Sequence, residues 1–210
     1  MEKKYAGSLI VIEGLDGSGK STHIRMLSSR LRAMGRQTFE TAEPTASATG
    51  GLVRDALSGL TPRTGDEIAA LFLADRIAHN VHPVNGIEAM LKAGRDVISD
   101  RYYYSSLAYQ GRLTDPDWVA KINIDCPAVR KPDICIFLDL DDDACCRRME
   151  HGRAYREIYE NRKALMETRA QYFAVFDRLK GRDNIHIISS GRPTQEVAED
   201  VFRAVSEILD

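Results

Sequence analysis

The sequence predicts an α/β fold, a doubly wound five-stranded parallel sheet with helices between the strands. Short apolar runs of strand length alternate with longer amphipathic stretches along the whole chain, and this alternation is typical of such sheets. The 210 residues suffice for one well-filled hydrophobic core. No internal repeat, low-complexity tract or linker divides them, so we expect one domain, residues 1–210.

The first half of the chain predicts three strands and three helices. Ser8–Glu13 (SLIVIE) is a short apolar run that indicates a buried strand. The stretch Lys20–Met34 has helical character and stops at Gly35, a residue common just after helices. The remaining elements expected here are the strands Gln37–Thr41 and Asp96–Ser99 and the helices Asp66–His79 and Ile87–Ala93.

The second half predicts the last two strands and the closing helix. The strand Ile134–Leu138 follows the break at Pro132, and Ile185–Ile188 is the final strand. Between them, Ala144–Leu179 is rich in Ala and Arg and predicts helix with an interruption near Gly152. Thr194–Leu209 is the closing helix. Sheets of this kind bind ligands in the crevice outside the carboxyl ends of their strands.

Composition narrows the classes of partner. The 29 Lys+Arg against 31 Asp+Glu give a formal charge of -2, which does not support nucleic-acid binding through a basic surface. The chain lacks both a signal-peptide core and an apolar run of about eighteen residues, so we expect a cytoplasmic protein without a membrane partner. The cysteines show no C-x-x-C ligand pair, and we expect free thiols at Cys126, Cys135, Cys145 and Cys146.

The segment after the first strand carries a phosphate-binding loop. GLDGSGKS matches G-x-x-x-x-G-K-[ST] without a gap, between a strand and a helix. Backbone N–H groups of this P-loop would cradle phosphate oxygens at the positive end of the helix. Lys20 would reach the β- and γ-phosphates of ATP, and the Ser21 hydroxyl would bind Mg²⁺. The candidate nucleotide-binding residues are Gly14, Leu15, Asp16, Gly17, Ser18, Gly19, Lys20, Ser21 and Thr22.

A second candidate site follows the third strand at Asp100-Arg101. An Asp at the carboxyl end of a strand can hold magnesium-bound water, and an adjacent Arg can bind a phosphate with both arms of its guanidinium. A structural alternative remains open, in which Asp100 caps a helix starting at Tyr103 and Arg101 lies on the surface.

Several blocks resemble thymidylate kinases when they are taken together. The blocks are GLDGSGKS, Glu43-Pro44-Thr45, LFLADRIAH at 71–79 and DRYYYSSLAYQG at 100–111. They occur in the family's order between Leu9 and about Tyr172. The resemblance implies a P-loop kinase fold and transfer of phosphate from ATP to dTMP with Mg²⁺, making dTDP for dTTP synthesis. It also implies a homodimer.

The resemblance implies roles for the substrate-binding side chains. Phe72 corresponds to the ring that stacks on thymine, and Arg76 to the donor to the base O4. Their i, i+4 spacing puts both on one helix face, although Phe72 could equally be a core residue. Arg101 corresponds to the arginine that holds the acceptor phosphate. The remaining matches, to groups that contact the base and sugar, are Ser106, Tyr109 and Gln110.

Two acidic residues match the family but have structural alternatives. Asp16 corresponds to the carboxylate near the sugar 3′-OH and the metal, where Ser21 and Asp100 would also act. Alternatively, the Asp16 side chain braces the loop backbone. Glu43 corresponds to the Glu-Pro edge that shapes the acceptor pocket. Alternatively, it is a surface residue before a proline turn.

An arginine-rich segment at 147–160 resembles the flap that closes over the triphosphate in such kinases. Closure would exclude water and neutralise charge on the transferring group. An arginine in this position is worth roughly 10³–10⁵ in rate in related phosphoryl transfers. The P-loop offers Gly17 where some members have a basic residue, so we expect the arginine from the flap. Arg153 is the first candidate and Arg156 the second; a solvated helix face with an Arg156–Glu160 pair is the alternative.

The chain departs from the family pattern in two places, and other functions remain open. Ala42 stands where an arginine usually precedes Glu-Pro, and Ile158 stands where the flap usually has Arg. A deoxynucleoside kinase would use Glu43 as a base, but 45–48 lacks the aromatic residue expected after Glu-Pro. Another nucleoside monophosphate kinase is a further alternative. A nucleotide-dependent switch is disfavoured, because the chain has no N-K-x-D motif.

Overall fold

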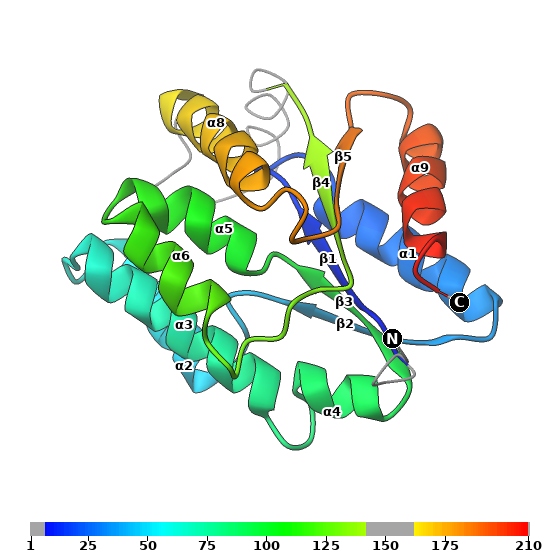
Figure 1. Ribbon diagram of the computed structural model, residues 1–210, viewed down its shortest axis with the longest axis horizontal. Coiled ribbons are helices and arrows are strands. Elements are labelled where there is room, and N and C mark those ends of the chain that lie inside the picture. The colour runs from blue at the N-terminus through cyan, green and yellow to red at the C-terminus, as the bar shows by residue number, and fades with distance from the viewer. Residues whose placement is uncertain (1–6, 142–161, 210) are drawn as a thin grey trace.

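Five parallel strands form the sheet at the centre of the molecule (Figure 1). The computed structural model describes residues 7–141 and 162–209. The strand order is β2-β3-β1-β4-β5, which confirms the predicted doubly wound parallel sheet. The strands are β1 (Leu9–Glu13), β2 (Gln37–Ala42), β3 (Arg95–Asp100), β4 (Ile134–Asp139) and β5 (Ile185–Ser189).

The register of the sheet brings four strand ends to one edge. Glu13 of β1 pairs with Phe137 of β4, and Ile12 pairs with Asp100 at the end of β3. Ala42, the last residue of β2, also pairs with Asp100. Because all strands run in the same direction, the loops that follow them open on the same side of the molecule.

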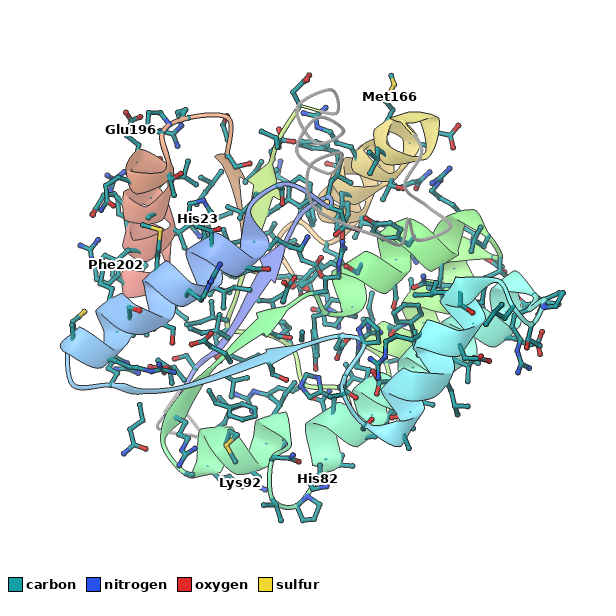
Figure 2. The ribbon with its side chains drawn as sticks, turned by 180° about the vertical axis from the view of Figure 1, so that it is seen from behind. His23, His82, Lys92, Met166, Glu196 and Phe202 are labelled. Atoms are coloured by element: carbon teal, nitrogen blue, oxygen red, sulfur yellow. The ribbon has the colours of Figure 1, made fainter. Side chains whose placement is uncertain are left out.

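Consecutive residues of the central strand face two separate cores. Ile10 and Ile12 belong to a core cluster with residues of α1 (Lys20–Ala33) and α9 (Thr194–Ser206). Figure 2, which views the molecule from behind, shows these two helices on the near face of the sheet, with Phe202 of α9 labelled. The Arg30 guanidinium lies 3.6 Å from the centre of that ring, so α1 and α9 are joined across their exposed rim.

The opposite face is covered by a larger group of helices. Leu9 and Val11 pack there in one cluster with Tyr172. Figure 1 shows most helices on this side of the sheet. They are α2 (Ala48–Ser58), α3 (Gly65–Val81), α4 (Ile87–Lys92), α5 (Tyr103–Tyr109), α6 (Pro116–Ile124) and α8 (Arg162–Arg178), with a 3₁₀ turn at Gln110–Arg112.

Two helices of this layer, α2 and α6, were not expected from the sequence. The Ser47 side chain accepts a hydrogen bond from Gly50 N at the start of α2, and Gly59 ends the helix in a left-handed conformation. Asp115 caps α6 and Pro116 occupies its first turn. Both starts carry known cap residues, but the apolar stripe of each helix is only two turns long and gives a weak periodic signal.

The structure describes only part of the long helix expected at Ala144–Leu179. Its second half is α8, Arg162–Arg178, and the interruption near Gly152 lies outside the described residues. Cys126 and Cys135 are free thiols, and Cys145 and Cys146 lie outside the described residues. Within 7–141 and 162–209, no helix is both long and apolar enough to cross a membrane.

Candidate active site

A cleft of about 380 Å³ opens at the carboxyl edge of the sheet. The loops after β1, β2 and β3 and the start of α8 surround it. Its walls therefore combine the predicted phosphate loop with the predicted acceptor segments. The residues lining it are Asp16, Gly17, Gly19, Lys20, Ser21, Thr22, Ala42, Glu43, Pro44, Leu57, Phe72, Asp100, Arg101, Ser105, Tyr109, Gln110 and Leu165.

The phosphate loop is shaped by three glycines, Gly14, Gly17 and Gly19, in conformations that other residues avoid. Gly14 has φ 149°, and a Cβ added there would lie 2.5 Å from Ser18 Oγ and 2.8 Å from the Leu138 carbonyl oxygen. Gly19, with φ 97°, occupies the N-cap of α1, where no side chain caps the helix and no acidic residue lies in the first turn. No side chain therefore competes with an anion for the first N–H groups of α1.

Lys20 is folded back over this loop. Its ammonium donates to the carbonyl oxygens of Gly14 at 3.1 Å and Leu15 at 3.2 Å. It also lies 3.5 Å from Asp16 Oδ1. Burial lowers the pKa of Lys20, and the charge of Arg101 lowers it further. A phosphate in the cleft would relieve both effects, so the position is suited to binding an anion.

Arg101 faces the phosphate loop from the end of β3. Its Nη2 donates to Asp16 Oδ1 at 2.8 Å, which places the acceptor arginine and the P-loop carboxylate in direct contact. The backbone of Arg101 has φ 70°, and its N–H donates to the Ile12 carbonyl oxygen at 3.0 Å. Since a positive φ strains a residue with a side chain, the neighbouring contacts must hold this conformation.

The structural alternative for Asp100-Arg101 is wrong. The N-cap of α5 is Tyr102, and no side chain caps that helix. The Arg101 side chain is 17% exposed and ion-paired, so it is not a surface residue. Both side chains line the cleft.

The donor set fits a magnesium ion. Ser21 and Asp100 line the same cleft, and Asp100 Oδ1 is buried without a hydrogen-bond partner. Hydroxyl and carboxylate oxygens suit Mg²⁺, which usually takes one or two protein ligands and fills its other positions with water and phosphate oxygens. The described residues hold no cluster of three or more His, Cys, Asp or Glu side chains able to bind a metal. The fit therefore favours a nucleotide-bound ion over a closed protein site.

Glu43 is a buried wall of the cleft, so its interpretation as a surface residue is wrong. It is 5% exposed. Its Oε2 accepts from Arg76 Nε at 2.8 Å, and its Oε1 lies 3.0 Å from His79 Nδ1. The following peptide bond, Glu43–Pro44, is cis. The β2 end is thus tied to α3 through two side chains.

Arg76 lies behind Glu43 and does not line the cleft. Its side chain is 1% exposed, and its Nη1 donates to Asn123 Oδ1 of α6. The structure therefore shows the guanidinium bound to protein groups and not turned toward a base. His79 and Asn123 were not expected in this network; their positions on helix faces gave no signal that α3 and α6 would meet here.

The remaining predicted acceptor residues divide between the wall and the layer beneath it. Phe72 lines the cleft and also packs against the core, so both of its interpretations describe part of its surroundings. Tyr109 and Gln110 line the cleft, whereas Ser106 is fully buried. Gln110 Oε1 is buried without a hydrogen-bond partner. Burial raises the pKa of Tyr109 to about 12, which keeps its hydroxyl neutral.

Asp75 holds the segment after Pro44. Its carboxylate accepts from Thr45 N at 2.7 Å, Thr45 Oγ1 at 2.6 Å and Thr49 Oγ1 at 2.7 Å. Burial alone would raise the pKa of Asp75, but these hydrogen bonds hold it below its ordinary value. Adjacent residues of α3, Asp75 and Arg76, thus fix the chain on both sides of Pro44.

We expect Asp75→Asn to lower the free energy of unfolding at pH 7 by about 1–3 kcal/mol, because one carboxylate oxygen loses its role as acceptor. A depressed pKa contributes stability that is present above the pKa of the unfolded chain, about 3.9, and is lost as pH falls through the folded value. The gap between wild type and variant should therefore narrow below about pH 4. Urea unfolding at several pH values measures it.

Asp55→Asn is the matched control for this experiment. Asp55 is an exposed residue of α2, and its replacement should change the free energy of unfolding by less than about 0.5 kcal/mol. A gap for Asp75→Asn that stayed constant down to pH 3 would contradict the assignment.

The arginines of the predicted flap, Arg147, Arg148, Arg153 and Arg156, lie outside the described residues. The chain is described again from α8, and Leu165 of that helix lines the cleft. Ala42, one of the two departures from the family pattern, also lines the cleft, so the wall has a methyl group where an arginine would stand. The other, Ile158, is not described.

Comparison with known proteins gives consistent results. A model of the thymidylate kinase family matches residues 12–201. A probable thymidylate kinase of Thermococcus onnurineus is 36% identical over 210 residues, which cover 95% of this chain and 98% of the relative. A thymidylate kinase of Pelotomaculum thermopropionicum is 34% identical, with 97% and 95% covered. A probable thymidylate kinase of Methanosphaera stadtmanae is 33% identical, with 92% and 94% covered.

Proposed function

The chain belongs to the thymidylate kinase family, an ATP-dependent group of enzymes that convert dTMP to dTDP, and we propose that the cleft described above is where it does so. The observation that carries this proposal is the contact between Arg101 and Asp16. It puts a phosphate-binding arginine beside a phosphate-binding loop, in one cleft. Two phosphate groups can therefore be held close enough for direct transfer.

On the ATP side, we propose that residues 14–22 bind the triphosphate and Lys20 neutralises charge between its β- and γ-phosphates. Magnesium, when bound, would supply further neutralisation of the phosphate oxygens at Ser21 and Asp100, with Asp16 nearby. Lys20 would exchange its carbonyl partners for phosphate oxygens. Because a carbonyl oxygen is neutral and a phosphate is anionic, this exchange is favourable.

On the acceptor side, we propose that Arg101 holds the dTMP phosphate in line with the γ-phosphate. The acceptor phosphate is already anionic at neutral pH, so no strong base is needed, and catalysis is positioning and charge stabilisation. Phe72, Tyr109 and Gln110 would contact the base and sugar. Glu43 shapes the pocket, and its bonds to Arg76 and His79 leave it poorly placed to act as a base.

We also propose that Arg76 and Ser106 act on the acceptor side, and the structure sets a condition for their contact with the base. Both side chains are buried behind the cleft wall. Direct contact with the base would require Arg76 to release Glu43 or Asn123 on substrate binding. If Arg76 keeps these bonds when the substrate binds, its role is to hold the Glu43 carboxylate in place.

We further propose one domain with a flap at 147–160, a cytoplasmic location and a homodimer. Leu52 of α2 and Leu60 after it are exposed, and an interface over these large apolar side chains would remove them from water. We propose that Arg153, or else Arg156, completes the charge stabilisation from the flap.

The function is tested by ADP formation with ATP and Mg²⁺ against dTMP, dUMP, dCMP, dGMP, AMP, UMP and thymidine. We expect the fastest turnover with dTMP and slower turnover with dUMP, because one methyl group is worth only about 1–3 kcal/mol. Thymidine should be inactive. Turnover of thymidine but not dTMP would overturn the proposal in favour of a nucleoside kinase.

We expect Arg101→Lys to lower kcat/KM for dTMP by about 10- to 100-fold while KM for ATP changes less than about twofold. Lysine keeps the charge but loses the two-armed geometry, and a small misplacement of a reacting group can cost up to about 10²-fold. Steady-state kinetics with each substrate varied in turn measure both constants. An equal loss for both substrates would contradict an acceptor-side role.

A further inference from the structure

Glu13 is a buried carboxylate next to the phosphate loop that no binding role explains. It is the last residue of β1 and directly precedes Gly14. Its side chain is fully buried, and it is not among the residues that line the cleft. It therefore reaches no substrate, and any effect on the reaction must pass through its neighbours.

Four hydrogen bonds converge on this carboxylate from two helices. Its Oε1 accepts from the backbone N–H of Tyr102 at 2.8 Å and of Ser105 at 3.2 Å, at the start of α5. Its Oε2 accepts from Ser105 Oγ at 2.7 Å and from the Tyr172 hydroxyl of α8 at 2.8 Å. The contacts join β1, α5 and α8, which come together near the carboxyl end of β1 (Figure 1).

The same two hydroxyls also contact Arg101. Arg101 Nη1 donates to Ser105 Oγ at 3.0 Å and to the Tyr172 hydroxyl at 3.4 Å. A hydroxyl has one proton and can accept at the same time. The two hydroxyls also lie 2.8 Å from each other, so their two protons are divided between Glu13 and this contact, and both oxygens keep lone pairs that can accept from the Arg101 guanidinium. That guanidinium reaches Asp16 with its other arm, so both arms are fixed.

Glu13 also acts on the backbone beside Arg101. It accepts a hydrogen bond from the backbone N–H of Tyr102, which directly follows Arg101, the residue with φ 70°. The Ser99 hydroxyl fixes the carbonyl of Arg101 on the other side, at 2.7 Å. Burial raises the pKa of Glu13, whereas the charge of Arg101 and these hydrogen bonds favour its ionised form. Glu13 thus takes part in holding both the strained backbone and the guanidinium of Arg101.

We propose that Glu13 is a positioning residue for phosphoryl transfer, which aims Arg101 at the acceptor phosphate through the hydroxyls of Ser105 and Tyr172. This inference rests on the proposed function, because the acceptor phosphate is the group that Arg101 serves there. It adds that the acceptor arginine is held from behind by the residue before the phosphate loop. Binding of the two substrates is thereby built on one rigid unit.

The variants Glu13→Gln and Tyr172→Phe test the proposal. Glutamine keeps the shape and one acceptor but adds donors and removes the charge, and phenylalanine removes only the hydroxyl. In this variant the ring at position 172 should keep its packing against Phe137; the two ring centres lie 4.8 Å apart. Tyr104→Phe is the matched control, since Tyr104 is also buried and donates to Asp183 at 2.8 Å, away from the cleft.

We expect both test variants to lower kcat/KM for dTMP by about 10- to 100-fold while KM for ATP changes less than about twofold. Tyr104→Phe should lower the melting temperature without changing either constant more than about twofold. In an Arg101→Lys background, Glu13→Gln should cause almost no further loss, because residues that act as one unit are not additive. The proposal would be overturned if the losses of Glu13→Gln and Arg101→Lys multiplied fully in the double variant. It would also be overturned if Glu13→Gln and Tyr172→Phe had the same kinetics as the Tyr104→Phe control.

The NMR signal of the Arg101 Nη1 protons, the group that contacts both hydroxyls, gives a second readout that requires no turnover. It is assigned by its disappearance in Arg101→Lys. It should be sharp and protected from exchange with water in wild type and Tyr104→Phe, and broadened or lost in Glu13→Gln and Tyr172→Phe. An unchanged signal would overturn the positioning role even if the wild type phosphorylates dTMP. Failure of the wild type to phosphorylate dTMP would instead overturn the proposed function, and the signal would still test the positioning.

Discussion

Replacing Lys20 by methionine should lower kcat about 10³-fold. The loss of one preorganised donor at a developing charge costs about 10²–10³ in rate, and Lys20 contributes a full charge in a buried position, 7% exposed. Methionine has a similar length and preserves the packing, so the change isolates the ammonium group. Because ATP also contacts the backbone of residues 14–22 in the proposed complex, KM for ATP should rise much less than kcat falls.

Lys92→Met is the control for Lys20→Met. Lys92 is an exposed residue at the end of α4, and Figure 2 shows it far from the start of α1. The control should keep kcat within about twofold, because Lys92 does not line the cleft. The folded state should also persist, since surface substitutions away from such features change stability by only about 0.5 kcal/mol. Pre-steady-state measurement of ADP formation separates the chemical step from product release. A Lys20→Met enzyme with kcat within tenfold of wild type would remove Lys20 from the proposed mechanism.

β1, β4 and β5 could be predicted because each one is a short apolar run with a clear end, whereas β2 (QTFETA) is mostly polar and gave a weaker signal. β1 and β5 differ from their expected ranges by one residue, since the flanking residues are polar. α2 and α6 could not be predicted in this way. Their apolar residues meet neighbouring helices only in the folded chain, as shown by Val119 and Ala120 of α6 in the core. Tertiary contact, and not local pattern, determines these two helices.

The phosphate loop and Asp100-Arg101 could be predicted because their chemistry lies in contiguous residues. The groups that hold them could not. Glu13 and Tyr172 are 159 residues apart in the chain, yet their side chains lie 2.8 Å apart. Asp75 looks like a polar residue on an amphipathic helix until the segment after Pro44 is placed against it. A motif identifies groups that touch the substrate, whereas a supporting network depends on the packing of distant elements.

The described cleft has no surplus of positive charge, because the third carboxylate among its lining residues, Glu43, is ion-paired at 2.7 Å with Arg76 behind the wall. Among the described residues that line it, the carboxylates are Asp16, Glu43 and Asp100, and the cations are Lys20 and Arg101. Both substrates carry anionic phosphates, and the transition state spreads charge over the transferring group. Ala42 supplies no charge at the position where the resemblance led us to expect an arginine. The proposed reaction therefore requires positive charge from elsewhere in the chain, besides the metal ion.

We expect that charge from the flap, and Arg153→Ala should lower kcat by about 10³–10⁵-fold, the range found for such arginines in phosphoryl transfer. Leu165 of α8 lines the cleft, and the segment 147–160 precedes this helix in the chain. KM for dTMP should change little, because Arg101 holds that phosphate. Lysine at position 153 should restore part of the rate, since it returns the charge without the fork.

Arg156→Ala distinguishes a single catalytic arginine from a general basic surface. If Arg153 acts alone, this variant should lose less than about tenfold in kcat, in line with an ordinary exposed ion pair worth about 0–1 kcal/mol. A large loss for Arg156→Ala alone would assign the catalytic role to Arg156. The basic side chain would then lie two residues before Ile158, the position where the family pattern has Arg. Small losses for both variants would mean that the flap supplies no catalytic charge. The negative charge of the bound phosphates would then have to be balanced by Lys20, Arg101, magnesium and the helix dipole of α1 alone.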